Sequence, residues 1–385
     1  MNRLLWHMLH GLMAGMLAAC GSAPVQLSAP AARPSSMPEP QRQVGAGDAG
    51  ATLPAPITRA SGRWWPVHWA ELPGFEDDTL FEAWGAWLKS CTRPGPAFAP
   101  LCIEVRRLSI GSAEEQRIWL MKRLQPYRVE DLAGSADGLL TAYFEPVLEA
   151  TRTASANFTV PLYRPPNGLA QRQPWYTRQE IDTLAPAQVA LQGREIAFLE
   201  NPIDALVLQI QGSGRLRITE ADGSRVWVRL AYAASNEQPY RSVGRWLLDQ
   251  GALRDASWPA IKAWALQNPA RVNEMLWTNP RTVFFREERL SDQDAASGPK
   301  GAQGVPLTPG RSIAVDPGSI PFGTPVWLAS SGVNINLQKL VLAQDTGNAI
   351  VGAVRADYFV GWDVAAAELA GRLKQPLRLW VLWPK

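Results

Sequence analysis

The chain has 385 residues and a nearly balanced charge, with 38 Lys and Arg against 35 Asp and Glu. Its basic residues are not bunched, which argues against a nucleic-acid partner. Its length exceeds one ordinary domain, so one large domain or two medium ones are expected. Of three histidines, two lie in the N-terminal apolar segment, which leaves His68 for the rest of the chain. A Ser-His-Asp or Cys-His catalyst and a His-rich zinc site are therefore unexpected, and we predict no metal and no cofactor.

The N-terminus has the pattern of a secretory signal. Met1-Asn-Arg3 precedes an apolar segment that ends in Leu17-Ala-Ala-Cys20, which predicts a signal over residues 1–19 with cleavage before the cysteine. The segment is too short to span a membrane. It resembles a bacterial lipoprotein signal, which implies a lipid on Cys20 and, because no Asp follows, sorting to the outer membrane. An ordinary signal with an incidental cysteine is the alternative.

Residues 20–62 are rich in Pro, Ala, Ser and Gly and contain few large apolar residues. Such a composition predicts a disordered tether, which would reach on the order of 35 Å. The two other cysteines, Cys91 and Cys102, lie in a proline-rich segment. An oxidising periplasm favours a disulfide between them, and two buried thiols are the alternative.

The rest of the chain predicts short strands with some helices. Apolar residues spaced three and four apart predict helices at residues 80–88, 112–124, 242–248 and 260–266. Short apolar runs predict strands at residues 138–150 with a break at the proline, and at 158–163, 205–210, 215–218, 225–230, 305–310, 320–328 and 377–383.

Two motifs in the first half could contact a ligand. Tyr143-Phe-Glu145 places an aromatic pair and a carboxylate at a strand end, which is typical either of a sugar platform with a polar handle or of a plain edge strand. Gln211-Gly-Ser-Gly214 is a glycine turn. It either brings backbone N–H groups close to a ligand or is simply a hairpin turn. It is neither a phosphate-binding P-loop nor a nucleophile elbow.

Three aspartates near the C-terminus each follow an apolar run. Two of them lie within residues 340–361, and the third lies upstream of this stretch. They are Asp316, Asp345 and Asp357, and we expect each at a strand end. One explanation is turn chemistry, because Asp hydrogen-bonds its own backbone in tight turns. The other is a cluster of carboxylates in partly apolar surroundings, which shifts their pKa values apart and prepares one of them as an acid.

From about Pro66 to Lys385, the chain resembles the membrane-bound lytic murein transglycosylase A family. The resemblance rests on the number and order of short motifs. They are Leu140-Thr-Ala-Tyr-Phe-Glu-Pro146, Ile210-Gln-Gly-Ser-Gly-Arg-Leu216, residues 279–285, Gly298-Pro-Lys-Gly-Ala-Gln-Gly304, Ala314-Val-Asp316, Ala343-Gln-Asp-Thr-Gly347 and Arg355-Ala-Asp-Tyr-Phe359.

The resemblance implies a mainly β fold in which a double-psi β-barrel domain of the three-aspartate type is interrupted by a second, inserted β-barrel domain. The expected bounds are 63–146 and 276–385 for the first domain and 147–275 for the insert. The implied reaction is cleavage of the β-1,4 bond between N-acetylmuramic acid and N-acetylglucosamine without water, which leaves a 1,6-anhydromuramoyl end. The expected partners are peptidoglycan glycan strands, in a groove between the domains, and the outer membrane; no particular cell-wall synthesis or remodelling protein is implied.

Carried onto this chain, the resemblance makes Asp357 the catalytic carboxylate, with Asp345 and Asp316 beside it. Hydrolysing glycosidases usually need two carboxylates, but one suffices if the sugar's C6 hydroxyl is the nucleophile. We expect burial and the charge of Asp345 to keep Asp357 protonated. The candidates for gripping the glycan are Tyr143, Glu145, Gln211, Gly212, Ser213, Gly214, Arg215, Tyr232, Asn236 and Tyr240.

Three residues replace a glycine that is usual in the family: Ala142, Glu237 and Asp363. Glycine turns can demand a positive φ, which Asp tolerates better than most residues. We therefore expect these positions to affect the shape of the groove more than its chemistry.

Two other functions fit the same residues. A hydrolase on the same barrel would yield a reducing end in place of an anhydro end. A catalytically silent, glycan-binding lipoprotein would link outer membrane and wall, but the presence of both Asp345 and Asp357 argues against it.

Cys20→Ser is expected to block lipidation and release a soluble, folded protein, because Cys20 is the anchor that the signal predicts. Fractionation of cells before and after a high-salt wash measures this. Variant protein that stays in the membrane fraction after the wash would refute the anchor assignment.

Overall fold

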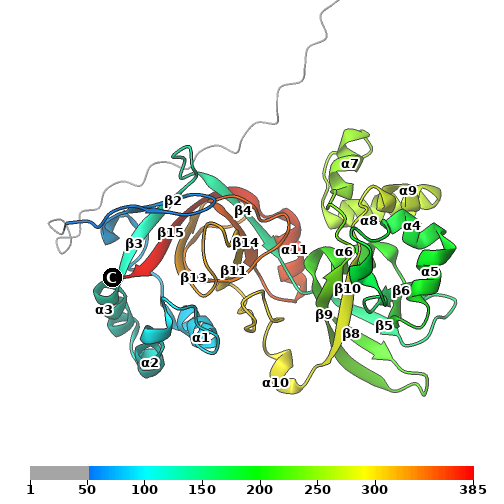
Figure 1. The fold of residues 1–385 in the computed structure, drawn as a ribbon, viewed down its shortest axis with the longest axis horizontal. Helices are drawn as coiled ribbons and strands as arrows, with labels where there is room; N and C mark the ends of the chain where they lie inside the picture. Colours follow the sequence, from blue (N-terminus) through cyan, green and yellow to red (C-terminus); the bar gives the residue numbers. More distant parts are fainter. Residues whose placement is uncertain (1–51) are drawn as a thin grey trace, which may run out of the picture. The chain divides into compact units, whose positions relative to one another are not determined.

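The computed structural model describes residues 52–385, so the predicted signal, Cys20 and most of the tether lie outside the described residues. Within this part, the chain is mainly β, as expected, and forms two sheets with helices around them (Figure 1). No helix in residues 52–385 is long and apolar enough to cross a membrane.

The first sheet has nine strands from both ends of the described chain, in the order β1-β2-β3-β15-β12-β13-β11-β14-β4. Strand β4 pairs with β14 on one side and β15 on the other, so the last six strands close into a ring. Two pairs in this ring, β11–β13 and β14–β4, are parallel. The strands are β1 (Ile57–Thr58), β2 (Arg63–Pro66), β3 (Leu124–Glu130), β4 (Gly138–Tyr143), β11 (Ser312–Val315), β12 (Pro325–Ser330), β13 (Leu337–Asp345), β14 (Arg355–Phe359) and β15 (Lys374–Pro384).

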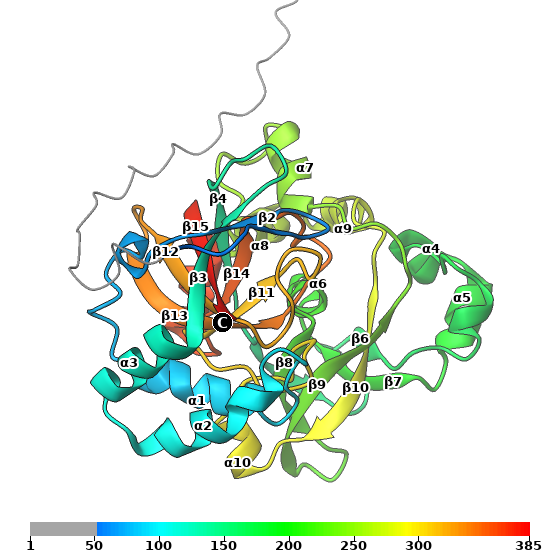
Figure 2. The ribbon, with the colours of Figure 1, turned by 60° about the vertical axis from the view of Figure 1, so that its left-hand side comes forward.

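Three helices lie together beside this sheet (Figure 2): α1 (Phe81–Ser90), α2 (Cys102–Arg107) and α3 (Ala113–Arg123). The predicted cap of the third helix is confirmed, because Ser112 and Glu115 form a capping box. Trp84, Trp87 and Trp119 stack edge to face or tilted at 5.5–5.6 Å between ring centres. This cluster joins Trp327 and Trp380 of the sheet in one core, so these tryptophans are structural.

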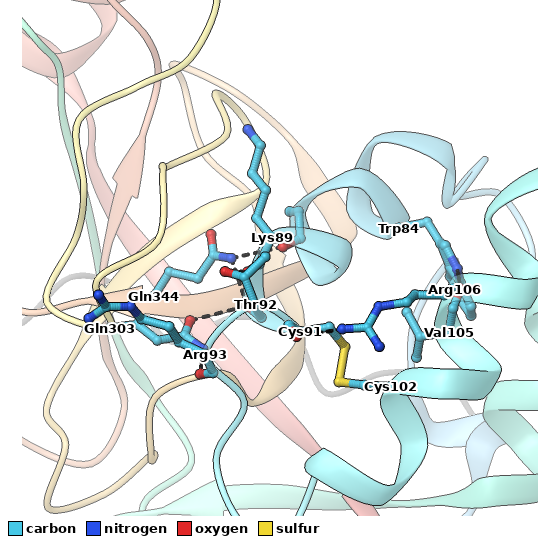
Figure 3. Close-up of a disulfide and its surroundings, with 12 residues drawn as sticks. Trp84, Lys89, Cys91, Thr92, Arg93, Cys102, Val105, Arg106, Gln303 and Gln344 are labelled. Atoms are coloured by element: carbon cyan, nitrogen blue, oxygen red, sulfur yellow. Dashed lines mark hydrogen bonds between the residues drawn. A yellow bond between two sulfur atoms is a disulfide. The ribbon is translucent and has the colours of Figure 1, made fainter. Parts of the chain in front are cut away.

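Cys91 and Cys102 form a disulfide with Cα atoms 5.5 Å apart, which confirms the predicted pairing (Figure 3). It ties the end of α1 to the start of α2. Arg106 donates to the carbonyl oxygen of Cys91 at 2.9 Å, a second link between the same two helices. The position of the chain that leaves α1 is therefore fixed from both sides.

A polar network joins this end of α1 to the loop of residues 299–304 (Figure 3). Nε2 of Gln344 donates to the hydroxyl of Ser90 at 2.7 Å, and that hydroxyl donates to Oε1 of Gln303 at 3.1 Å. Gln303 in turn donates through its side chain to the carbonyl of Arg93 at 3.1 Å. The helical layer thus holds the loop against the end of β13.

The second sheet has six strands in the order β10-β9-β8-β5-β7-β6, and its edge strands β6 and β10 lie in contact, so it is nearly closed. Its strands are β5 (Val147–Thr151), β6 (Val160–Tyr163), β7 (Glu195–Leu199), β8 (Ser213–Thr219), β9 (Arg225–Ser235) and β10 (Val283–Arg289). The remaining helices are α4 (Arg178–Thr183), α5 (Ala185–Leu191), α6 (Pro202–Gln211), α7 (Val243–Asp249), α8 (Trp258–Gln267), α9 (Val272–Trp277), α10 (Asp292–Ala295) and α11 (Val364–Arg372).

Two strand predictions were wrong. Residues 205–210 lie in helix α6, which Asn201 caps by accepting from the N–H of Ile203, with Pro202 in the first turn. A short apolar run cannot tell a buried strand from a buried helix, and here the capping residues decided. Residues 305–310 form no strand, only an isolated bridge between Lys300 and Pro306.

The structure also differs at two expected boundaries. Ordered structure begins inside the expected tether, because β1 pairs with β2 through Ile57 and Trp64. The second sheet includes β10, which lies beyond the expected end of the insert at residue 275. The domain division as a whole stays a prediction.

Candidate active site

A cavity of about 810 Å³ lies against the first sheet and the second sheet. Its wall on the first side consists of Tyr143, Asp345, Asp357 and residues 299–302 and 346–350, with Arg93 and Gly304. Its wall on the second side consists of Arg178, residues 209–213, Ala231, Tyr232, Tyr240, Asn279, Arg281, Val283 and Arg286.

Two of the three predicted aspartates are brought together by strand β11. Ala314 on β11 pairs with Asp345 on β13 and with Asp357 on β14, its two neighbours in the sheet. Directly paired residues point to the same face, so the two carboxylates flank a small methyl group, with their Cα atoms roughly 10 Å apart across two strand spacings.

Asp357 lies in the middle of β14, whereas the sequence predicts it at a strand end. Its register partner on β4 is Thr141, whose hydroxyl donates a short hydrogen bond to Oδ1 of Asp357. Arg355 donates through Nη2 to the oxygen of Thr141 at 2.8 Å. Because a guanidinium cannot accept, the hydroxyl proton of Thr141 must point to Asp357.

Burial raises the pKa of Asp357, against the hydrogen bond from Thr141 and the charge of Arg355, which lower it. Arg355 and Asp357 form no direct ion pair in residues 52–385; the threonine stands between them. A direct ion pair would favour the ionised carboxylate far more strongly. The arrangement therefore orients Asp357 without forcing it to lose its proton.

Asp345 has a different environment. Its Oδ1 accepts from the backbone N–H groups of Ala302 and Thr346, and its Oδ2 accepts from the hydroxyl of Tyr143, all at 2.9 Å. Burial raises the pKa of Asp345, these bonds lower it, and the charge of Asp357 raises it. Burial and Asp345 raise the pKa of Tyr143 well above its usual value, so the phenol keeps its proton and donates it. Burial thus raises the pKa of Asp357, as we expect, and the repulsion between Asp345 and Asp357 acts on the two carboxylates as a pair.

Asp316 does not line the cavity. Its two carboxylate oxygens accept from the N–H of Gly318 at 2.8 Å and of Gly352 at 2.9 Å. These bonds tie the turn after β11 to the chain that leads into β14. The structure thus gives this aspartate the turn chemistry that we weighed as one explanation, while the other two form the carboxylate pair.

The predicted glycan contacts divide into two groups. Six of them line the cavity: Tyr143, Gln211, Gly212, Ser213, Tyr232 and Tyr240. Four do not: Glu145, Gly214, Arg215 and Asn236. The four are buried, and their contacts explain why their residue types are needed.

Glu145 is fully buried between two arginines. Its carboxylate pairs with Nε of Arg215 at 2.8 Å and Nε of Arg229 at 2.5 Å. Arg215 also donates to the carbonyls of Ala295 at 2.7 Å and Ser297 at 2.9 Å. This triad joins the link between β4 and β5 to β8, β9 and the chain after α10, so its role is structural.

Gly214 and Asn236 also serve the fold. A Cβ on Gly214 would lie 2.3 Å from Cδ1 of Leu208, so only glycine fits there. Asn236 donates through Nδ2 to the carbonyls of Tyr176 and Pro280 at 2.8 Å and holds three segments together. The turn Gln211–Gly214 is not a hairpin: Gly212, at φ +77°, ends helix α6 and β8 follows directly.

Of the three residues that replace a glycine, the structure explains Asp363. Glu237 has a φ of +55°, a conformation that glycine adopts more easily. Asp363 caps α11 by accepting from the N–H of Ala366 at 2.7 Å, which a glycine could not do. Ala142 lies within β4.

Sequence reasoning missed Thr141 and Arg355, and also the basic residues of the cavity, among them Arg178, Arg281 and Lys300. Thr141 belongs to the motif Leu140–Pro146 and lies two residues before Tyr143. Its use became visible only with the register of β4 on β14, because the two strands are separated by more than two hundred residues.

The comparisons with known proteins agree with this fold. Residues 139–286 match the model of the MltA specific insert domain, and residues 311–383 match the 3D domain. Membrane-bound lytic murein transglycosylase A of Vibrio cholerae is 34% identical over 256 residues, which cover 63% of this chain and 65% of that relative. The chain thus spans slightly less than two thirds of that relative's length.

Two solved structures are similar over most of the chain. The lytic transglycosylase LtgG of Burkholderia pseudomallei is 41% identical and covers 89% of this chain and 100% of its own, with a TM-score of 0.58. MltA from Neisseria gonorrhoeae, in its monoclinic form, is 27% identical and covers 91% of this chain and 97% of its own, with a TM-score of 0.71.

Fold and site together define a two-sheet, mainly β protein in which an insert domain, residues 139–286, precedes a 3D domain, residues 311–383, that carries the carboxylate pair. The chain belongs to the membrane-bound lytic murein transglycosylase A (MltA) family.

Glu145→Gln is expected to lower the free energy of unfolding by about 3–5 kcal/mol, because it leaves two buried arginines without a countercharge. Glu149→Gln is the matched control: Glu149 on β5 pairs with Arg217 on the neighbouring strand β8 but is half exposed, so about 0–1 kcal/mol should be lost. Urea unfolding followed by circular dichroism measures both. Unchanged stability together with a raised KM would instead give Glu145 a role in binding.

Proposed function

We propose that this protein is a lytic transglycosylase that cleaves the β-1,4 bond between N-acetylmuramic acid and N-acetylglucosamine in peptidoglycan without water. The observation that carries the proposal is the pair Asp357 and Asp345 in one cavity, where burial raises both pKa values. The names of the similar proteins, which are lytic transglycosylases, support it.

In the proposed reaction, Asp357 is the acid and then the base. Its proton goes to the glycosidic oxygen as the bond from C1 of N-acetylmuramic acid breaks. The C6 hydroxyl of the same sugar then bonds to C1 and returns its proton to Asp357, so the carboxyl is regenerated and a 1,6-anhydro ring is left. No second carboxylate is needed to activate a water molecule.

The contacts of Asp357 favour one oxygen for the proton. Oδ1 already accepts from Thr141, so Oδ2 is left to carry the proton that the acid donates. Arg355 fixes the direction of the threonine hydroxyl without contacting the carboxylate. We assign Thr141 and Arg355 as positioning residues.

Asp345 and Tyr143 shape the site without exchanging the proton. Asp345 holds the backbone at Ala302 and Thr346 through two hydrogen bonds, which fixes both loops of the first wall. Tyr143 lines the cavity and is a candidate contact for the glycan together with Gln211, Tyr232 and Tyr240.

Two finer features belong to the same proposal. We infer that the six-stranded ring is a double-psi barrel, which is supported by its two parallel pairs, β11–β13 and β14–β4. We also infer a lipid anchor on Cys20 at the periplasmic face of the outer membrane, supported by the signal and by the membrane-bound relative in Vibrio cholerae.

Asp357→Asn is expected to reduce turnover of purified sacculi to near the detection limit, because both proton transfers fail together and each is worth about 10²–10⁴-fold. Binding of glycan and thermal stability should stay roughly unchanged. Mass spectrometry of the digests measures the loss of 1,6-anhydro products in the variant, and reducing ends in the wild-type digest would indicate a hydrolase.

Asp345→Asn is the comparison within the same experiment, and it should do less harm. If Asp345→Asn were inactive while Asp357→Asn kept a tenth or more of wild-type turnover, the two roles would be reversed.

Thr141→Val is expected to reduce kcat by about 10- to 100-fold, because Asp357 loses its orientation. The hydrogen bond from Thr141 lowers the pKa of Asp357, so its removal raises that pKa. The acid form then persists to higher pH, and the alkaline limb of the kcat/KM profile moves to higher pH. Thr141→Ser keeps the hydroxyl and should keep the wild-type profile; an unshifted limb in Thr141→Val would contradict the assignment.

A further inference from the structure

Residues 52–385 contain five buried arginines, and four of them pair with carboxylates. Arg215 and Arg229 pair with Glu145, Arg311 pairs with Asp78, and Arg117 pairs with Glu76 and Glu114. The fifth, Arg178, is 9% exposed and has no carboxylate within ion-pair distance in the described chain. A buried charge without a countercharge is costly and needs a reason.

Arg178 lies at the start of α4 and lines the cavity. Its polar contacts are neutral: Nε donates to the carbonyl of Asn279 at 3.1 Å, and Nη2 donates to Oε1 of Gln209 at 2.7 Å and to the carbonyl of Arg281. Nη1 has no hydrogen-bond partner in residues 52–385. Burial lowers the pKa of Arg178 to about 10, while the more distant charge of Asp182 raises it, so the guanidinium stays charged at neutral pH.

Three more cations that line the cavity, Arg93, Arg281 and Lys300, lack a carboxylate partner within residues 52–385. Arg281 donates through Nη1 to the carbonyl of Gln238 at 3.1 Å. When the side-chain amide of Asn348 is oriented with its oxygen toward Arg281, that oxygen accepts from Nη1 of Arg281 at 2.9 Å. Lys300, on the opposite wall, makes no side-chain ion pair. By contrast, Arg286 in the same cavity pairs with Glu288 at 2.9 Å.

We propose that Arg178, Arg281 and Lys300 form an anion site in the cavity that binds a carboxylate of the peptide stem on the substrate. This inference rests on the proposed function and adds the part of the substrate that carries the charge. The sugars of a peptidoglycan strand are N-acetylated and uncharged, and the lactyl group is bonded to the stem as an amide. The stem peptide carries the free carboxylates, and arginine binds carboxylates through charge-assisted hydrogen bonds.

The site also explains why the two catalytic carboxylates do not repel such a substrate. Asp345 and Asp357 line the same cavity, and their negative charge would oppose an anionic stem once either ionises. The cations of the cavity that have no carboxylate partner in the described residues offset that charge. They also fix which stretch of the strand lies over Asp357, because a stem occurs only on N-acetylmuramic acid.

The test compares three substrates made from one batch of strands: native strands, strands whose stem carboxylates are methylamidated, and strands stripped by an amidase, which keep only the lactyl carboxylate. The variants are Arg281→Gln and Lys300→Gln, because Arg178 also holds the chain at residues 279–281. Arg254→Gln is the control, since it removes one charge from an exposed position that does not line the cavity.

For native strands, Arg281→Gln and Lys300→Gln are each expected to raise KM by about 10-fold or more, the usual effect of losing a hydrogen bond between charged groups. For methylamidated strands, KM should be unchanged by either variant, and Arg254→Gln should change neither. Added salt should raise the wild-type KM for native strands only.

An equal rise in KM for native and methylamidated strands would overturn the anion site. A rise that persists with amidase-stripped strands would assign the bound carboxylate to the lactyl group and overturn the stem assignment. Absence of anhydro products from all three substrates with wild-type protein would instead refute the proposed function itself.

Discussion

The site depends on the pairing of β4 with β14, two strands that lie more than two hundred residues apart in the chain. This pairing closes the ring of six strands, and its register places Thr141 beside Asp357 and Tyr143 beside Phe359. Two residues after β4 comes Glu145, whose two arginines fasten the chain as it enters the second sheet. One short segment therefore sets both the surroundings of Asp357 and the position of the opposite wall.

The distribution of ion pairs separates the structural parts from the cavity. In the core, carboxylates such as Glu145 and Asp78 accept directly from arginine, and these ion pairs hold segments together. In the cavity, Asp357 is separated from Arg355 by a threonine, and Arg178 has no carboxylate within ion-pair distance in the described chain. This lack of direct pairing is what the proposed acid and the proposed anion site both require.

The first wall of the cavity is supported from outside the barrel. The disulfide fixes the chain after α1, and Ser90 and Gln344 carry that support to Gln303. The residue before Gln303 in the loop, Ala302, donates its backbone N–H to Asp345. Hydrogen bonds from backbone N–H groups favour the ionised form of a carboxylate, so the rigidity of this loop bears on the electrostatics of the site as well as on its shape.

The sequence by itself determined the mainly β class, the capped helix at Ser112, the disulfide and the pair Asp345 and Asp357, because each follows from local composition, spacing or motif. Only the tertiary structure decided the roles of residues whose partners are distant in the chain. Glu145 looked like a ligand handle, but it is buried between arginines of β8 and β9. Asp316 looked equivalent to the other two aspartates, yet it closes a turn. Strand register and the packing of two sheets around one cavity, not sequence neighbours, determine what the side chains of Thr141, Arg178 and Arg281 contact.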